Sequence, residues 1–319
     1  MSITRQGDRP RHPEPWVVSS PLLSWAAPLA CTVLSYGLAG GIWKQADLGT
    51  AQFCILLVAV KGVLNTFTWV GLGRPPLVGG RFLAWAMAGQ LFNGVAWIAY
   101  FRALEVGPAA LVQTITSGYT ALAAVLALVF LKERLAAIQL LGVALAIAAT
   151  LMLGGRSAGQ SLELSGWFAY SLLTVLCWAV AVTFFKQAYL QPGANDTTFF
   201  MINALGMALT MLPYGLAGQP QWTGALGLGF FIVFLYALGD LTLFAAIHRG
   251  PAAIVSPLSG LYPVPTLLYA AVILHEPITR LQWTATAMVL AAIVLVVPAQ
   301  ENPVLVWLKA RQAQHLKEE

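Results

Sequence analysis

The chain of 319 residues has the composition of a membrane protein. Hydrophobic residues make up 59% of it, charged residues make up 9%, and the mean hydropathy is +0.76; a soluble domain carries about 25% charged residues. The net charge of +5 does not indicate nucleic-acid binding, because the basic residues stand at the ends of apolar runs. Cys31, Cys54 and Cys177 lie inside apolar runs, which indicates small core residues rather than a disulfide or metal framework.

Ten segments are apolar over about 20 residues, the length that a helix needs to cross a bilayer. They are 22–45, 50–72, 81–104, 108–131, 137–154, 165–190, 195–217, 223–247, 251–274 and 280–298. The connections are short and rich in Gly, Pro, Asn and Asp, so none separates soluble domains. The sequence therefore predicts an all-α polytopic membrane protein with ten transmembrane helices and with tails at 1–21 and 299–319.

The second half of the chain repeats the first at a constant shift along the sequence. The tetrapeptide Gly-Pro-Ala-Ala at 107–110 recurs at 250–253, and Tyr119 recurs as Tyr262. Near the start of each half the shift is slightly shorter, and Thr32 matches Thr174. A long-period repeat in so apolar a chain is typical of secondary transporters, which hold substrate between the two halves.

The repeat divides the chain into two units, 22–154 and 155–298. Each unit has five predicted spans, and an odd number of spans gives the two units opposite orientations in the membrane. With the N-terminus inside, twelve Lys or Arg residues fall on the inner side and four on the outer side. This distribution satisfies the positive-inside rule. We expect an integral protein of the cytoplasmic (inner) membrane with both termini in the cytoplasm.

Polar and aromatic side chains recur at helical spacing within these spans. Gln113, Thr116 and Thr120 share one face of the fourth span, and Ser256 stands at an equivalent place in the ninth. Polar groups in a bilayer are costly unless they face protein or a water-filled cavity. The candidates for the wall of such a cavity are Tyr36, Lys61, Asn93, Trp97, Gln113, Thr116, Tyr119, Trp178, Asn203, Tyr236, Asp240, Ser256 and Tyr262. The alternative is that these residues only pack helix against helix.

The ninth span contains three prolines, Pro257, Pro263 and Pro265. Each lacks an amide donor and clashes with the preceding turn, so the span is predicted to break or kink near its middle. Broken helices at membrane depth persist where they line a cavity. A purely architectural kink is the alternative.

Two charges stand deep in their spans. Lys61 is about 16 Å from either end of its span and Asp240 about 10 Å from the inner end, at about 1.5 Å per residue. A lysine side chain cannot reach the interface from that depth, so it must be paired or face water. We expect Asp240, beside Tyr236 and Trp97, to bring charge into the transport cycle by receiving an ammonium group. The alternative is a Lys61–Asp240 ion pair that only holds two helices together.

Several motifs of the chain resemble the EamA repeat of the drug/metabolite transporter superfamily. In the first half they are Ala-Leu-Glu-Val-Gly-Pro-Ala at 103–109 and Leu-Lys-Glu-Arg-Leu at 131–135, and in the second half Tyr-Pro-Val at 262–264 and His-Glu-Pro-Ile at 275–278. The resemblance covers about residues 22–298. It implies exporters of amino acids and other metabolites, with a cavity formed mainly by the first four spans of each half. Two positions depart from the pattern, because Thr120 replaces the usual proline of the fourth span and Lys61 the arginine common in the second.

The favoured function is a secondary transporter of a small organic metabolite, an amino acid or an amine, with export the favoured direction and protons a candidate coupling ion. The sequence contains no Gly-x-x-x-x-Gly-Lys phosphate loop and no His-Glu-x-x-His metal motif. We therefore expect no enzyme activity, no cofactor and no nucleic-acid partner; the partners are the metabolite and the lipid bilayer. A flippase for a lipid-linked substrate, or a structural or sensory membrane protein, remains the alternative.

Overall fold

The structure is a computed structural model that describes residues 21–74, 76–107, 112, 115–132, 135–154, 166–220, 222, 225–273 and scattered residues between 280 and 295. Almost all of the two predicted tails and most of the span predicted at 280–298 lie outside these residues. Every regular element in the described part of the chain is a helix.

The helices follow the apolar runs closely. They are α1 (Pro21–Ile42), the 3-10 turn η1 (Trp43–Gln45), α2 (Thr50–Gly71), α3 (Gly80–Val106), α5 (Tyr119–Phe130), α6 (Ala137–Gly154), α7 (Gly166–Tyr189), α8 (Asp196–Ala217), α9 (Leu226–Arg249), α10 (Ala252–Ser259) and α11 (Pro263–Val272). Within the described ranges, six of them are long and apolar enough to cross a membrane: α1, α2, α3, α7, α8 and α9. The chain thus forms an all-helical membrane protein, and the described residues do not contain all ten predicted spans as single long helices.

Polar side chains satisfy the start of α8 and the end of α9. The Asn195 side chain accepts a hydrogen bond from the Thr198 amide at 2.8 Å and caps the start of α8. At the end of α9, the Lys186 ammonium donates to the carbonyls of Ile247 and Gly250 at 2.9 and 2.7 Å. A cation at this end also opposes the negative pole of the helix dipole.

The predicted break in the ninth span is present. Gly260, Leu261 and Tyr262 form a turn between α10 and α11, and Pro263 begins the second helix. The fourth predicted span, 108–131, is also interrupted: residues 115–117 are helical, Gly118 is in a turn, and α5 begins at Tyr119. No break was predicted in this span, which has Thr120 in place of the proline usual at its middle. The interruption falls at the position equivalent to Leu261, so the two repeats share the break without sharing its proline.

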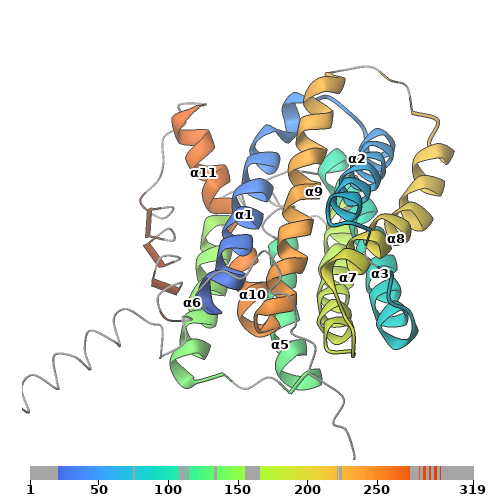
Figure 1. Cartoon of the computed structure of the whole chain (residues 1–319). Helices are drawn as coiled ribbons and strands as arrows, with labels where there is room; N and C mark the ends of the chain where they lie inside the picture. The colour runs from blue at the N-terminus through green and yellow to red at the C-terminus, as the bar shows by residue number, and fades with distance from the viewer. Residues whose placement is uncertain are drawn as a thin grey trace, which may run out of the picture.

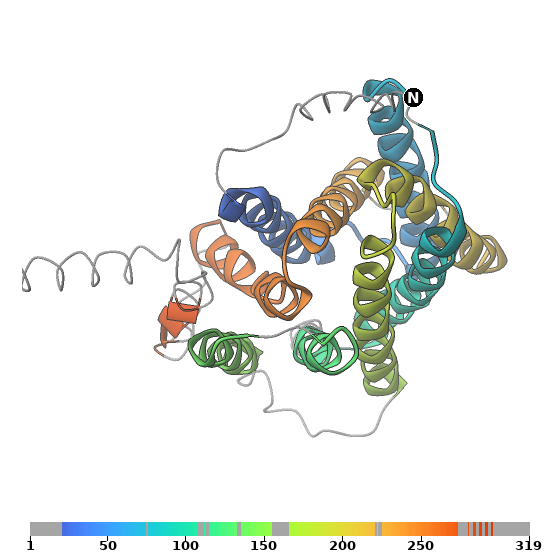
Figure 2. The same ribbon diagram turned by 60° about the horizontal axis from the view of Figure 1, so that its bottom comes forward.

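Packed pairs of helices from different repeats have counterparts in which every helix is replaced by its equivalent in the other repeat. The pair α1 and α9 corresponds to α7 and α3, and the pair α2 and α9 corresponds to α8 and α3. In Figure 1, α6 and α11 lie at one edge, α3 and α8 lie at the other, and α1 and α9 stand between them. Figure 2, in which the bottom of Figure 1 is turned forward, shows α5 beside α10, and these segments of the fourth and ninth predicted spans contact each other.

The equivalent helices α2 and α8 pack against each other in antiparallel fashion. Asn65, near the end of α2, donates to the carbonyl of Phe200, near the start of α8, at 2.6 Å. Ile55, near the start of α2, packs beside Gly215, near the end of α8. Two helices that the repeat relates therefore run in opposite directions.

Equivalent threonines make equivalent hydrogen bonds across the repeat. The Thr32 hydroxyl lies 3.2 Å from the Gly239 carbonyl, and the Thr174 hydroxyl lies 3.4 Å from the Ala96 carbonyl. The repeat matches Thr32 with Thr174, and it matches Ala96 with Gly239. The repeat is thus preserved at the level of individual hydrogen bonds between helices.

A small residue lets α1 approach α11 closely. A Cβ atom on Gly37 would lie 2.6 Å from both the Pro265 Cβ and the Tyr262 carbonyl oxygen. Gly41, one turn later, packs in the same way against the Tyr269 ring. The Gly-x-x-x-Gly pair of α1 therefore serves packing within the chain.

The apolar interior consists of two large clusters, one toward each end of the bundle. One contains Phe82, Phe185, Phe199 and Phe244, and the other contains Trp43, Phe53, Phe101 and Met211. Tyr36 and Trp178 pack against both clusters. These two side chains therefore mark the middle level of the bundle, where the candidate site lies.

Candidate functional site

A cavity with a mainly aromatic wall lies at this middle level. Its volume is about 40 Å³. On the same scale, one water molecule occupies about 10–15 Å³. It is lined by Tyr36, Asn93, Trp97, Tyr100, Tyr119, Trp178, Val182, Phe185, Tyr236, Asp240, Leu243, Phe244 and Tyr262. The lining comes from α1, α3, α5, α7, α9 and the turn before α11, so both repeats contribute to it.

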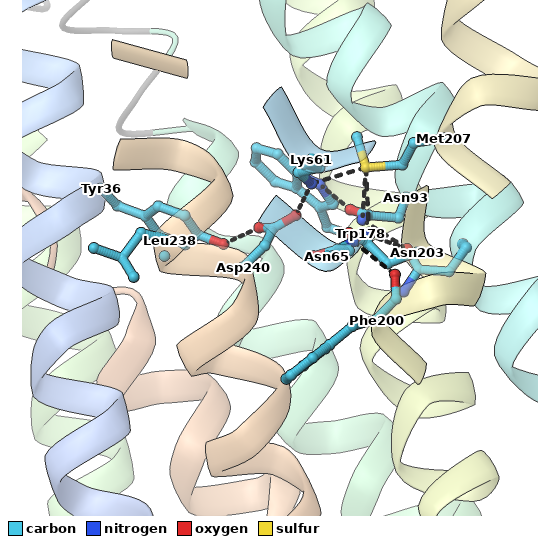
Figure 3. Close-up of polar contacts among 12 residues, drawn as sticks. Tyr36, Lys61, Asn65, Asn93, Trp178, Phe200, Asn203, Met207, Leu238 and Asp240 are labelled. Carbon is cyan, nitrogen blue, oxygen red and sulfur yellow. Dashed lines mark hydrogen bonds and ion pairs between the residues drawn. The ribbon is translucent and has the colours of Figure 1, made fainter. Parts of the chain in front are cut away.

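Asp240 is the one acidic residue of this lining, and both of its carboxylate oxygens have partners. Figure 3 shows the carboxylate between the Tyr36 hydroxyl, which donates to Oδ1, and the Lys61 ammonium, which is paired with Oδ2. The Asp240 residue is 3% exposed and Lys61 is 1% exposed. The buried Lys61–Asp240 ion pair, which the sequence left as an alternative, is therefore present in the structure.

Lys61 does not line the cavity. Its ammonium lies 2.8 Å from the Met207 sulfur and 5.6 Å from the centre of the Trp97 ring. A thioether is a weak acceptor, and an aromatic face attracts a cation only modestly. Asp240 is thus the only carboxylate paired with Lys61 among the described residues.

A second polar network joins the cavity to α8. The Trp178 indole donates to Asn93 Oδ1 at 3.1 Å, and Asn93 Nδ2 in turn donates to Gln90 Oε1 at 3.1 Å. Asn203 Nδ2 donates to the same Gln90 oxygen at 2.8 Å. Figure 3 shows this network beside the Asp240–Lys61 pair, with the Met207 sulfur between them. Asn93 and Asn203, two of the predicted amide side chains, are therefore joined through Gln90.

Aromatic rings surround the carboxylate. The Tyr36 ring centre lies 6.5 Å from that of Trp97 and 6.1 Å from that of Tyr236, and the Trp97 and Tyr236 centres are 5.0 Å apart. Elsewhere in the lining, the ring centre of Tyr119 lies 5.2 Å from that of Trp178. This arrangement suits a cation held beside Asp240 by charge and by ring faces.

Two equivalent aromatic pairs stand on opposite sides of the cavity. Trp43 and Phe101 stack with ring centres 5.0 Å apart in one apolar cluster, and Phe185 and Phe244 meet at 5.1 Å in the other. The repeat matches Trp43 with Phe185 and Phe101 with Phe244. Only the second pair touches the cavity.

The structure places most of the predicted site residues on the lining. Eight of the thirteen candidates line the cavity: Tyr36, Asn93, Trp97, Tyr119, Trp178, Tyr236, Asp240 and Tyr262. Lys61 and Asn203 lie behind this wall in the polar networks. Thr116 and Ser256 are buried in helical segments but do not line the cavity, and Gln113 lies outside the described residues.

Five lining residues were not among the candidates: Tyr100, Val182, Phe185, Leu243 and Phe244. The periodicity gave a signal for two of them, because Tyr100 shares a face with Asn93 and Trp97, and Phe185 is equivalent to Trp43. The other three are aliphatic or aromatic residues in apolar helices. Nothing in their spacing distinguishes a side chain that faces the cavity from one that faces lipid.

The chain resembles known proteins in both sequence and fold. It is 24% identical to an uncharacterized transporter, YvbV, of Bacillus subtilis over 65% of this chain and 67% of that protein. It is 34% identical to an uncharacterized transporter in the cobO 3' region of a Sinorhizobium species over 31% of this chain and 68% of that protein. A solved structure titled "Crystal structure of protein" superposes with a TM-score of 0.71 at 18% identity, covering 87% of this chain and 98% of that one.

The profile of the EamA-like transporter family matches the chain twice, at residues 23–155 and 165–297. These two matches cover nearly all of the helical part and coincide with the two halves of the internal repeat. The chain therefore belongs to the EamA-like transporter family.

Proposed function

We propose that this chain is a secondary transporter for a small organic metabolite that carries an ammonium group, either an amino acid or an amine. Membership in the EamA-like family makes it an integral membrane transporter rather than an enzyme. The proposed mechanism is alternating access between two inverted five-helix repeats, 22–154 and 155–298, with export as the favoured direction and protons as the candidate coupling ion.

The observation that carries this proposal is the carboxylate of Asp240 on the wall of an aromatic cavity. An ammonium group beside it would gain charge pairing from the carboxylate and cation–π attraction from Trp97 and Tyr236. The Trp97 indole nitrogen is buried and has no hydrogen-bond partner among the described residues. Because an indole N–H only donates, it suits an acceptor oxygen on the same substrate, such as the carboxylate of an amino acid.

The inverted arrangement is supported by the antiparallel packing of α2 and α8 and by the matching hydrogen bonds of Thr32 and Thr174. The twelve-to-four distribution of basic residues favours a cytoplasmic location for both termini. Ten spans, five in each repeat, satisfy both observations. The membrane proposed is the cytoplasmic (inner) membrane.

Transport by purified protein in liposomes tests this function. The panel contains aromatic, aliphatic and basic L-amino acids, phenethylamine, its uncharged analogue 2-phenylethanol, and a fluorescent phospholipid. We expect at least one ammonium compound to be transported, and phenethylamine to compete for this transport better than 2-phenylethanol. Movement of the phospholipid alone would favour a flippase, and no movement of any compound would favour a structural or sensory protein.

The Asp240→Asn variant connects the function to the site. It keeps the size of the side chain but removes its charge, so we expect normal folding with loss of transport or of its pH dependence. Because this variant leaves Lys61 without a carboxylate, the double variant Lys61→Met/Asp240→Asn serves as a folding control, since removing both charges together avoids a lone buried charge. Normal transport with unchanged pH dependence in Asp240→Asn would contradict the role of the carboxylate. Misfolding of the single variant but not of the double variant would favour a purely structural pair.

A further inference from the structure

Among the described residues around Lys61, only Asp240 offers its ammonium a charged partner. Its ammonium contacts Asp240 Oδ2, the Met207 sulfur at 2.8 Å and the Trp97 ring at 5.6 Å. The three partners come from three helices packed around α2. Among the described residues, α9 provides the one carboxylate, whereas α8 provides an uncharged thioether and α3 an uncharged ring. Tyr36 of α1 reaches the group only through the other oxygen of Asp240.

The charges around the cavity sum to zero before a substrate enters, because Lys61 contributes one positive charge and Asp240 one negative charge. The other ion pairs of the described residues, Arg102–Glu105 and the pairs of Asp196, stand near helix ends. A cationic substrate would therefore add an uncompensated charge to a buried, mainly aromatic site. Such a charge costs several kcal/mol in a low-dielectric interior.

We propose, resting on the function proposed above, that Lys61 gives up its proton when the ammonium group of the substrate binds Asp240. The substrate ammonium forms the new ion pair with the Asp240 carboxylate, the Lys61 ammonium becomes a neutral amine, and its proton leaves to water. One cation enters and one proton departs, so the net charge of the site stays at zero. When the substrate leaves, Lys61 takes up a proton and pairs with Asp240 again.

The surroundings of Lys61 fit the neutral amine. A thioether and an aromatic ring accept a neutral group at low cost, whereas they replace a carboxylate poorly for an ammonium. The chemistry also explains why lysine suits this position better than arginine. A buried lysine can lose its proton, while a guanidinium stays charged in proteins. Lys61, rather than Asp240, is then the residue that exchanges the proton.

Nitrogen-15 NMR of lysine-labelled protein in micelles tests this exchange. Phenethylamine and the amino acids of the transport panel are added one at a time, and proton release is followed in parallel with a pH-sensitive dye in weak buffer. We expect every compound that binds to move the Lys61 Nζ signal from the ammonium to the amine position and to release one proton per bound molecule. The neutral 2-phenylethanol should do neither.

The matched variants are Lys61→Arg and Lys186→Arg. Lys61→Arg identifies the Lys61 signal and, because its charge is permanent, should weaken binding of the ammonium compounds by at least about tenfold. Lys186→Arg makes the same change at a helix end, where the side chain donates to two carbonyls, and should bind and release protons like the unaltered protein.

The possible outcomes separate the two proposals. Binding of an ammonium compound while Lys61 remains an ammonium, with no proton released, would overturn the exchange and leave the transport function standing. Failure of every ammonium compound to bind would overturn both. If Lys61→Arg does not fold, the double variant Lys61→Met/Asp240→Asn identifies the Lys61 signal instead, and the spectrum of the unaltered protein then decides the matter.

Discussion

Asp240 and Trp97 occupy equivalent positions in the two repeats, and both line the same cavity. Their neighbours are also equivalent, since Tyr36 donates to Asp240, and Trp178, equivalent to Tyr36, packs against Trp97 at 5.4 Å. The repeat therefore preserves the geometry of the pair but puts a carboxylate on one side and a ring on the other. Among the residues that line the cavity, the one charged side chain, Asp240, comes from the second repeat.

The hydrogen bond from Tyr36 to Asp240 should contribute more to stability than a neutral one in the same cavity. Tyr36→Phe removes a donor to a carboxylate, a bond that is worth about 1.5–3 kcal/mol. Tyr119→Phe removes a hydroxyl that lies 3.1 Å from the Ser259 hydroxyl, and such a neutral bond is worth about 0.5–1.5 kcal/mol. Unfolding of both variants in mixed micelles measures the difference. Equal losses of stability would contradict a charged partner for Tyr36.

The contact between α5 and the end of α10 should be sensitive to a single methyl group. A Cβ atom on Gly260 would lie 2.7 Å from Thr120 Cγ2 and 2.9 Å from its Oγ1. We expect Gly260→Ala to lower the free energy of unfolding by about 1–3 kcal/mol through overpacking.

The double variant Gly260→Ala/Thr120→Ala is the control for this contact. Removing the Thr120 side chain makes room for the added methyl group, so the double variant should recover part of the lost stability. A double-mutant cycle in which the two changes simply add would show that the clash is not the cause.

The approach of α1 to α11 should depend on Gly37 for a different reason, since its neighbours include backbone. Gly37→Ala would meet the Tyr262 carbonyl, which cannot move aside like a side chain, so thermal stability should fall. Gly62→Ala is the matched control inside α2, because no atom lies within 4 Å of its added Cβ atom. This control should keep or raise stability, since alanine favours a helix over glycine by about 1 kcal/mol. Similar losses in both variants would rule out close packing as the cause.

Asp47 and Leu190, which follow the equivalent first helices of the two repeats, should be accessible from opposite sides of the membrane. Both are exposed in the structure, just after η1 and α7. In a background without Cys31, Cys54 and Cys177, an impermeant maleimide should label Asp47→Cys in intact cells. It should label Leu190→Cys only after the cells are opened. Equal labelling of the two positions from outside would contradict the inverted repeats.

The helices themselves were predictable from the sequence. The run 50–72 became Thr50–Gly71, and the run 137–154 became Ala137–Gly154. A bilayer offers the backbone no hydrogen-bond partners, so an apolar run long enough to span it must satisfy its own polar groups as a helix. The break after α10 was predictable for a similarly local reason, because Pro263 cannot continue the preceding helix.

The break at Gly118 could not be predicted from local sequence, since no proline stands there. The fourth and ninth predicted spans contact each other at this level, where Thr120 packs against the position of Gly260. Such an interruption reflects the tertiary environment that both halves share, whereas propensity describes each segment alone.

The sequence by itself determined the class of the protein, the repeat and the depths at which Lys61 and Asp240 stand. Only the tertiary structure decided that Asp240 faces the cavity while Lys61 lies behind it, and that Tyr36 shares the carboxylate. Helical spacing fixes the face and depth of a side chain on its own helix. Which of two paired charges reaches the cavity depends on how α1, α2 and α9 pack together, and that packing is the sum of contacts far apart in the chain.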